Sequence, residues 1–164
     1  MRAILALLVI AVFAWANAFD DGMAAGELGD YQEAVRQFTQ AIKVDPKLAT
    51  AYYNRGLSYA MLGDESEAIA DYTQTIKIDP NHTDAYYNRG NLYDHLGDYS
   101  KAIADYTQAI RIDINFALAY ANRGISYANL GNFNKATQDA RKACELGECD
   151  LLQALERDGK ISNQ

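Results

Sequence analysis

Apolar side chains recur at three- and four-residue steps along most of this chain, a spacing typical of amphipathic helices. Within residues 49–82, one run places Tyr52 and Tyr59 on a single helical face, and a second run does the same for Ala68 and Tyr72. The pattern predicts two helices joined by a short turn.

Polar and flexible residues mark the ends of these helices. Gly63 is expected to end the first helix, because glycine tolerates the left-handed conformation found just past helix ends. Asp64 is expected to cap the second helix and to form a capping box with Glu67. The second helix should end at Asp79, since Pro80 disfavours a helical conformation in the residue before it. The equivalent capping residues elsewhere are Asp30, Asp98 and Asn132, and Asp30 also fits a capping box with Glu33.

The same pattern returns every 34 residues, so the chain contains an internal repeat. The hexapeptide AYYNRG occurs at 51–56 and 85–90, with the near copy AYANRG at 119–124. Small residues keep the interval in three series: Gly22, Gly56, Gly90 and Gly124; Gly29, Gly63, Gly97 and Gly131; and Ala34, Ala68, Ala102 and Ala136. A period of this length indicates stacked helical hairpins that bury their apolar faces against their neighbours.

One unit carries the pattern Tyr52, Gly56, Tyr59, Gly63, Ala68, Tyr72 and Pro80, and it resembles the tetratricopeptide repeat. The resemblance implies an all-α fold, namely a right-handed α-solenoid of about four helix-turn-helix units followed by a C-terminal capping helix. The units would be 19–48, which is truncated, 49–82, 83–116 and 117–150, within a repeat domain of residues 19–158. Two positions depart from the pattern: Ile114 stands where proline is usual, and Ala140 stands in a slot that is otherwise aromatic, at Phe38, Tyr72 and Tyr106.

The segment after the fourth unit is expected to cover its exposed core. Leu151, Leu152 and Leu155 fall on one face of a short predicted helix at residues 150–158, and repeat arrays need such an end cap. Residues 159–164 are polar and are expected to form a frayed tail.

The first 18 residues differ from the rest of the chain. Arg2 precedes a 12-residue apolar run, Ile4–Trp15, and residues 16–18 supply the small-residue pattern of a signal-peptidase site. This segment is typical of a secretory signal peptide. The alternative, an uncleaved membrane anchor, is disfavoured because the run is shorter than the ~20 residues that span a bilayer. We therefore expect an exported protein, periplasmic or secreted after cleavage near Ala18.

Charge and motif content argue against several functions. With 15 basic and 22 acidic residues, the chain lacks the electrostatic attraction that drives binding to phosphate backbones, so nucleic acid is not an expected partner. It contains no Gly-rich phosphate loop, nucleophile elbow or His-Glu zinc motif, and both histidines, His82 and His95, are interpreted as surface residues. We expect no enzyme, no cofactor and no metal.

The only two cysteines are Cys144 and Cys149, which flank Gly147. Two cysteines with no nearby histidine cannot supply the four ligands of a structural zinc site. In an oxidising compartment we expect a disulfide between them, provided that Gly147 breaks the helix that would otherwise hold the thiols apart. The alternative is two free thiols.

Arginine and aspartate recur together at a fixed spacing. An acid follows sixteen residues after each of three arginines: Asp71 after Arg55, Asp105 after Arg89, and Asp139 after Arg123. The truncated first unit has neither residue, carrying Asp21 and Gln37 at those positions. We expect a structural ion pair between the two helices of each complete unit. The alternative is an exposed arginine that meets a ligand.

An asparagine precedes each of these arginines, at Asn54, Asn88 and Asn122. By the resemblance, these residues face the inner groove, as in the asparagine ladder of the repeats of O-linked N-acetylglucosamine transferase, where amides can pair with the backbone of an extended peptide. The predicted contact surface comprises Tyr53, Asn54, Tyr87, Asn88, Asn91, Asp94, His95, Asn122 and Asn129. Asp84 and Asp94 would repel a carboxylate, so the clamp that other members use for a chaperone's C-terminus is disfavoured.

The expected function is that of an exported scaffold or adaptor that binds a peptide segment or partner protein in a concave groove. The alternative is a structural subunit of an envelope complex, or a homo-oligomer, that pairs through the convex face or the ends of the array.

Overall fold

A computed structural model describes residues 18–159 of the chain. Most of the predicted signal peptide, residues 1–17, and the predicted tail from residue 160 lie outside the described residues. All regular structure in residues 18–159 is helical, which confirms the all-α prediction. Residues 18–27 are helical and are followed by α2 (Tyr31–Val44), α3 (Ala49–Leu62), α4 (Glu65–Ile78), α5 (Thr83–His95), α6 (Tyr99–Ile112), α7 (Ala117–Asn129), α8 (Phe133–Glu145) and α9 (Asp150–Arg157).

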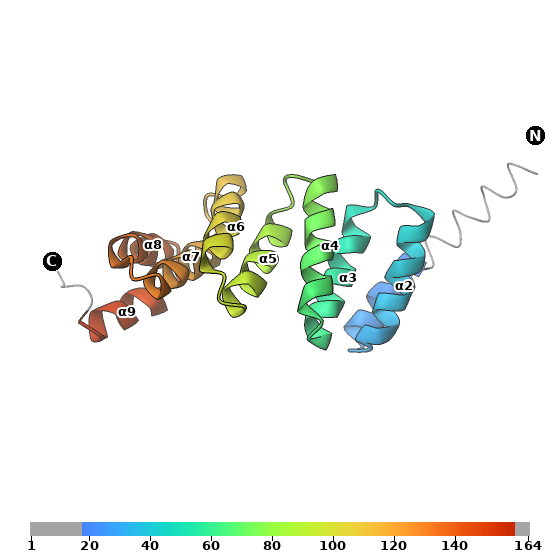
Figure 1. Cartoon of the computed structure of the whole chain (residues 1–164), viewed down its shortest axis with the longest axis horizontal. Coiled ribbons are helices and arrows are strands. Elements are labelled where there is room, and N and C mark those ends of the chain that lie inside the picture. Colours follow the sequence, from blue (N-terminus) through green and yellow to red (C-terminus); the bar gives the residue numbers. More distant parts are fainter. Residues whose placement is uncertain (1–17, 160–164) are drawn as a thin grey trace, which may run out of the picture. The chain divides into compact units, whose positions relative to one another are not determined.

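The chain divides into two compact units, the first ending at Pro80 and the second beginning at Asn81. In unit 1, the helical residues 18–27 and α2 form hairpin 1, while α3 and α4 form hairpin 2, with α2 packed beside α3 (Figure 1). In unit 2, α5 and α6 form hairpin 3, α7 and α8 form hairpin 4, and α9 packs on α8 and α7. Consecutive hairpins therefore stack within each unit.

The helix ends largely follow the predicted residues. Gly63 caps α3 at φ 83°, in the left-handed region, and the side chains of Asp30, Asp98 and Asn132 accept hydrogen bonds from the first turns of their helices. Asp64 occupies the N-cap position of α4 as predicted, but its side chain makes no capping hydrogen bond, so the predicted capping box with Glu67 does not form there. Glu65 and Glu67 lie in the first turn of α4, where their negative charges interact favourably with the positive N-terminal end of the helix dipole and stabilise the helix.

Only one of the two hydrogen bonds of the predicted capping box at Asp30 is present. The Glu33 backbone N–H donates to the Asp30 carboxylate at 3.1 Å. The Glu33 carboxylate accepts instead from Arg36 and Gln37 one turn further along α2. The charged arginine offers the glutamate a stronger hydrogen bond than a backbone amide does.

The core of each hairpin consists of small residues packed around one large side chain. In hairpin 2, Ala51 and Ala68 are fully buried and Tyr72 is 1% exposed. A Cβ added at Gly56 would lie 2.9 Å from the Tyr72 ring, so only glycine leaves room for this aromatic side chain. The constant spacing between this glycine and the aromatic residue in the repeat therefore reflects a packing contact between the two.

Hairpin 4 fills the corresponding space differently. Ala140 occupies the slot of Tyr72, and it is fully buried. A Cβ added at Gly124 would lie 2.6 Å from the Leu151 side chain, which comes from α9. Leu155 of the same helix is 3% exposed against Ala136 and Ala140. The C-terminal helix therefore supplies the large side chain that hairpin 4 lacks.

Candidate functional site

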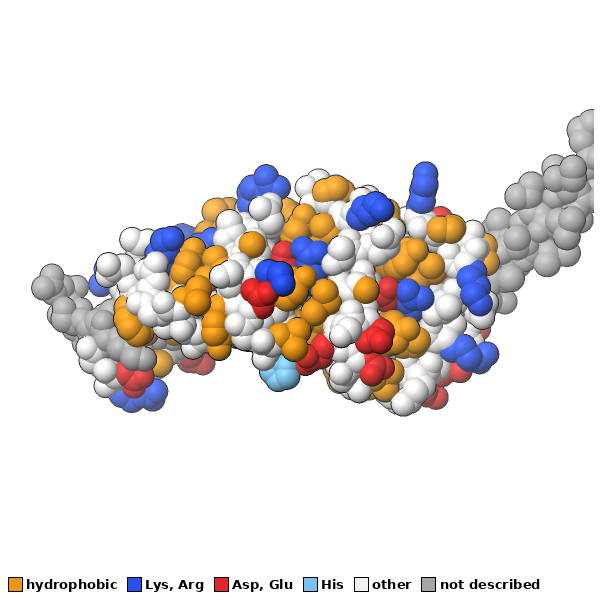
Figure 2. Space-filling view, in the orientation of Figure 1, with side chains coloured by type: hydrophobic (Ala, Val, Ile, Leu, Met, Phe, Trp, Pro, Cys, Tyr) orange, Lys and Arg blue, Asp and Glu red, His pale blue; other side chains and the backbone are white. Residues whose placement is uncertain are grey.

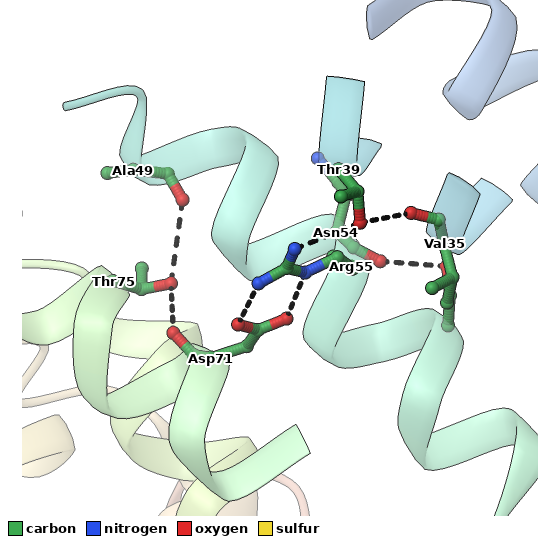
Figure 3. A network of polar contacts seen from close by, with 8 residues as sticks. Val35, Thr39, Ala49, Asn54, Arg55, Asp71 and Thr75 are labelled. Carbon is green, nitrogen blue, oxygen red and sulfur yellow. Dashed lines mark hydrogen bonds and ion pairs between the residues drawn. The ribbon is translucent and has the colours of Figure 1, made fainter. Parts of the chain in front are cut away.

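An arginine–aspartate pair joins the two helices in each of hairpins 2, 3 and 4. In hairpin 2, Arg55 Nε and Nη2 donate to the two carboxylate oxygens of Asp71, both at 2.7 Å (Figure 3). The same two-point geometry joins Arg89 to Asp105 at 2.8 Å, and Arg123 to Asp139 at 2.8 and 2.7 Å. Two parallel hydrogen bonds fix both the distance and the orientation of the paired helices.

A threonine adds a third helix to this contact. Arg55 Nη1 donates to Thr39 Oγ1 of α2 at 2.9 Å, and Arg123 Nη1 donates to Thr107 Oγ1 of α6 at 3.1 Å. The arginine thus ties its hairpin to the preceding one within the same unit. This threonine was not among the predicted site residues, although Thr39, Thr73 and Thr107 keep the same 34-residue interval as the arginines and aspartates.

The surroundings of Arg55 indicate a structural residue. Its side chain is 16% exposed and that of Asp71 is 7% exposed. The hydrogen bond to Asp71 raises the pKa of the Arg55 guanidinium. The rings of Tyr52 and Tyr59 lie 5.6 and 5.8 Å from the guanidinium carbon, within the range of cation–π attraction. A guanidinium enclosed by these partners has little surface left for a ligand.

The predicted contact residues of unit 1 lie in different surroundings. Tyr53 is half-buried, and its ring packs against Tyr72 at a centroid distance of 5.9 Å. The Asn54 amide nitrogen donates to the backbone carbonyl of Thr50, and its side chain lines an apolar hollow of about 360 Å³ together with Leu57 and Met61. Of the two residues, Asn54 is the one that borders an open space.

In unit 2, four of the predicted residues come together. Asn91, Asp94, His95 and Asn122 line one hollow of about 190 Å³ between α5 and α7, whose other walls are Tyr106 and Ile125. Asn129 is exposed and does not line this hollow, and Asn88 is half-buried. The first helices of hairpins 3 and 4 therefore build a small polar site.

Hydrogen bonds brace this site from within. The Tyr106 hydroxyl donates to Asn91 Oδ1 at 2.8 Å, and Asn122 Nδ2 donates to the same oxygen at 2.9 Å and to the Tyr87 hydroxyl at 3.1 Å. Burial raises the pKa of the Tyr106 hydroxyl above its ordinary value. Asn91 Oδ1 thus accepts two hydrogen bonds, and both amide hydrogens of Asn122 are engaged. The amide groups that remain to face a ligand are the Asn122 oxygen, an acceptor, and the Asn91 nitrogen, a donor.

Asp94 is fixed on the other side of the hollow. The buried Ser126 hydroxyl donates to Asp94 Oδ1 at 2.5 Å, and its oxygen also lies 3.1 Å from the Asn122 backbone carbonyl. The predicted surface did not include Ser126 or Tyr106, since a serine or an aromatic side chain at a core position gives no signal of its hydroxyl partner. The arrangement favours donors such as a peptide N–H or a basic side chain.

The two cysteines join α8 to α9. Cys144 and Cys149 form a disulfide across a turn in which Gly147 has a φ of 106°. In residues 18–159, no cluster of three or more His, Cys, Asp or Glu side chains is placed to hold a metal ion. Within the same range, no helix has the length and apolar character needed to cross a membrane.

Comparison with solved structures shows the fold. The chain is similar to a crystal structure of MamA, with 26% identity, a TM-score of 0.80, and coverage of 98% of this chain and 89% of that one. A MamA double mutant gives 22% identity and a TM-score of 0.78, covering 82% of this chain and 75% of that one. A MamA fragment from Desulfovibrio magneticus RS-1 gives 24% identity and a TM-score of 0.75, covering 83% and 77%. No curated protein matches the sequence.

Sequence models of one family match the chain in three adjacent segments. All three are described as tetratricopeptide repeat, and they match residues 19–83, 83–116 and 117–146. Proteins with this fold are typically interaction scaffolds rather than enzymes. Since the matches together take in most of the sequence, the chain belongs to the tetratricopeptide repeat family.

Proposed function

We propose that this chain is an exported scaffold that binds a peptide segment of a partner protein on the α5/α7 face of unit 2. The proposal rests on the hollow lined by Asn91, Asp94, His95 and Asn122, where the Asp94 carboxylate and the two amide side chains are held in place by hydrogen bonds. The Asp94 carboxylate and the Asn122 amide oxygen can accept from the backbone N–H groups of an extended segment, or from a basic side chain. His95 and Ile125 are exposed there and offer contact area.

Fixed polar side chains favour binding without a large entropic penalty. Asn91 and Asp94 are each hydrogen-bonded to a residue on another helix, so their side chains lose little freedom when a ligand arrives. The asparagine-ladder hypothesis changes at Asn122, because its amide nitrogen already donates to Tyr87 and Asn91. Asn122 would contact a peptide only through its oxygen, and it would also hold the Asn91 side chain in place.

A crosslinking pull-down from the envelope fraction tests this function. His95→Ala combined with Ile125→Ala should lower partner recovery about ten-fold relative to the unchanged chain. A matched control changes two exposed residues of the α6–α7 turn, Ile114→Ala with Asn115→Ala, and should recover partners normally. Equal recovery by all three proteins would count against a binding face between α5 and α7.

The alternative, a structural subunit, predicts a different behaviour in solution. Light scattering of the purified chain over a wide concentration range should give a constant monomer mass if the α5/α7 face serves a peptide. A mass that rises with concentration would support self-assembly instead.

We propose export from the apolar run Ile4–Trp15 and the small residues 16–18 that follow it. Cleavage after Ala18 would leave Phe19 as the first residue, and the Phe19 ring packs on Phe38 at a centroid distance of 5.7 Å. The new terminus would thus still contribute to the core of hairpin 1. The mass of the protein recovered from the envelope fraction tests this proposal: a chain that still begins at Met1 contradicts it.

A further inference from the structure

The hollow of unit 1 and that of unit 2 lie in the same register of the repeat. Residues that line the polar hollow of unit 2 have counterparts, two repeat lengths earlier, that line the hollow of unit 1: Asn91 and Met23, Asp94 and Gly26, His95 and Glu27, Tyr106 and Phe38, Asn122 and Asn54, and Ile125 and Leu57. The two units therefore use one backbone position for two different surfaces.

The hydrogen bonds that hold the side chains of the unit 2 hollow have no equivalents in the unit 1 hollow, because several of the residues that make them are replaced together. Phe38 lacks the hydroxyl of Tyr106, and Met23 lacks the amide of Asn91. Phe19 stands in the register position of Tyr87, and it also has no hydroxyl. In place of the cross-helix bond to Asn91, Asn54 donates to the Thr50 carbonyl of its own helix.

The floor of the unit 1 hollow is also wider. Gly26 has no side chain where unit 2 places the Asp94 carboxylate, and Ser58 turns its hydroxyl to the backbone carbonyl of Asn54. The hollow measures about 360 Å³, compared with about 190 Å³ in unit 2. Met23 and Met61 stand at its edge, 38% and 63% exposed. Methionine side chains adapt their shape to varied apolar partners.

We infer that the unit 1 hollow binds a large apolar side chain, such as leucine, methionine or phenylalanine, in a partner peptide that carries basic residues beside it. The inference rests on the proposed peptide-binding function and adds a second subsite with its own chemistry. Apolar burial supplies the attraction, because Met23, Phe38, Leu57 and Met61 line the space. The amide of Asn54, which also lines it, is hydrogen-bonded within its own helix.

The basic neighbours follow from the charges around the hollow. Glu27 lines it, Asp20 lies one turn before Met23 on the same helical face, and both acids are exposed. None of the residues that line the hollow is a lysine or an arginine. On the face seen in Figure 2, acidic, basic and hydrophobic side chains are interspersed. Arginine or lysine next to the apolar anchor would complement the two acids beside the hollow.

Methionine methyl groups provide a direct test, because two of the three methionines in the chain are Met23 and Met61. The full chain, labelled with ¹³C at the methionine methyls, is titrated with three capped nonapeptides. One has a central leucine between arginines, one has the leucine between glutamates, and one has a serine between arginines. Only the leucine–arginine peptide should shift the signals of Met23 and Met61 at low concentration, with at least a ten-fold preference over the others.

Position 26 offers matched variants that keep the fold. A Cβ added at Gly26 meets nothing within 4 Å, so side chains can be introduced there without a clash. Gly26→Leu fills the hollow and should weaken the leucine–arginine peptide about ten-fold, whereas Gly26→Ala should stay within about two-fold of the unchanged chain. Glu27→Gln, which changes only charge, should reduce the preference for arginine over glutamate flanks.

Several results would overturn the inference. They are equal shifts with arginine and glutamate flanks, methyl shifts that follow protein concentration without peptide, and shifts that appear only when residues 1–17 are removed. The last two would assign the hollow to a second copy or to the chain's own N-terminal segment. All three variants leave His95 and Ile125 unchanged, so loss of partner capture by the double alanine variant at those positions is separable from loss of peptide binding here.

Discussion

Hairpins 2 and 4 share a backbone plan but close their cores with different side chains. In hairpin 2, the space beside Gly56 holds Tyr72, which belongs to the hairpin itself. In hairpin 4, the space beside Gly124 holds Leu151, which belongs to α9. Hairpin 2 carries its own large core residue, whereas hairpin 4 depends on the helix that follows it, α9. An end cap in this chain therefore completes a repeat as well as shielding it from water.

The largest effect is expected when hairpin 2 loses its own core residue. Tyr72→Ala removes a ring that is 1% exposed and should lower the free energy of unfolding by about 4 kcal/mol. Urea unfolding followed by circular dichroism measures the loss, and hydrogen exchange locates it in α3 and α4.

Tyr72→Phe is the control for this change. It should cost less than about 1.5 kcal/mol, because a ring of nearly the same volume remains and Phe38 fills the equivalent slot of hairpin 1. If Tyr72→Ala and Tyr72→Phe unfolded at the same urea concentration, the ring would not be what closes the hairpin.

The arginine–aspartate pair is the feature that hairpins 2 and 4 have in common. Arg55→Ala and Arg123→Ala each leave a buried carboxylate unpaired and should each cost about 3 kcal/mol. Thermal unfolding monitored by circular dichroism measures both. Similar losses would show that the two hairpins differ only in how they fill the core.

An exposed pair in α2 supplies the control for the buried arginines. The Arg36 side chain is 65% exposed where it meets Glu33, so Arg36→Ala should cost less than about 0.5 kcal/mol. A loss at Arg55 as small as that at Arg36 would contradict a structural interpretation and favour an arginine reserved for a ligand.

The dependence of hairpin 4 on α9 can be broken at one side chain. Leu151→Ala should cost about 2 kcal/mol in unit 2, at the low end for leucine because the residue is only half-buried. Hydrogen exchange should show the loss in α7 and α8 and leave hairpin 2 unchanged.

A double change sharpens the same point. Ala140→Phe restores the aromatic slot and by itself should cost about 1–3 kcal/mol, because Leu151 already occupies the space. Combined with Leu151→Ala, it should recover part of both losses. Additive losses in this double-mutant cycle would mean that the two side chains do not compete for one site.

The disulfide anchors the helix on which hairpin 4 depends. Reduction should lower the stability of unit 2 by about 2 kcal/mol, the entropic estimate for so short a loop. Mass spectrometry before and after reduction establishes the bond through a shift of about two daltons, and urea unfolding in each state measures its effect. Because residues 18–80 contain no cysteine, protection of α3 and α4 from hydrogen exchange should not change.

The hairpins could be predicted from the 34-residue repeat. The structure could not be predicted at positions that depart from the repeat, such as Ala140. Glycine, alanine and arginine recur because each hairpin needs the same close contact and the same ion pair, so their interval in the sequence reflects geometry. Ala140 breaks the interval, and nothing in its own neighbourhood identifies Leu151 as the replacement. That assignment requires the angle at which α9 crosses α7 and α8, which depends on the turn at Gly147.

The candidate sites show the same limit. The pattern placed Asn91, Asp94, His95 and Asn122 on first helices, and the structure places them around one hollow. The repeat pattern did not distinguish the two hollows, because it identifies residues that recur every 34 positions, whereas most of the residues that line the two hollows differ at equivalent positions. The contrast between Asp94 and Gly26, or between Tyr106 and Phe38, has meaning only after their side chains are known to face the same space.

The smallest expected difference between the hairpins appears at high pH. Burial raises the pKa of Tyr72 above its ordinary value, so the folded chain keeps this hydroxyl protonated after the unfolded chain has lost the proton. The stability that Tyr72 contributes is therefore complete below pH ~10 and declines as the pH rises, by up to about 1.4 kcal/mol per pH unit. Hairpin 4 has Ala140 at this position and cannot respond in this way. Urea unfolding at pH 9 and pH 11 should show a smaller decline for Tyr72→Phe than for the unchanged chain. An identical decline in both proteins would mean that other groups govern the alkaline loss, and that the aromatic slot sets the hairpins apart in packing alone.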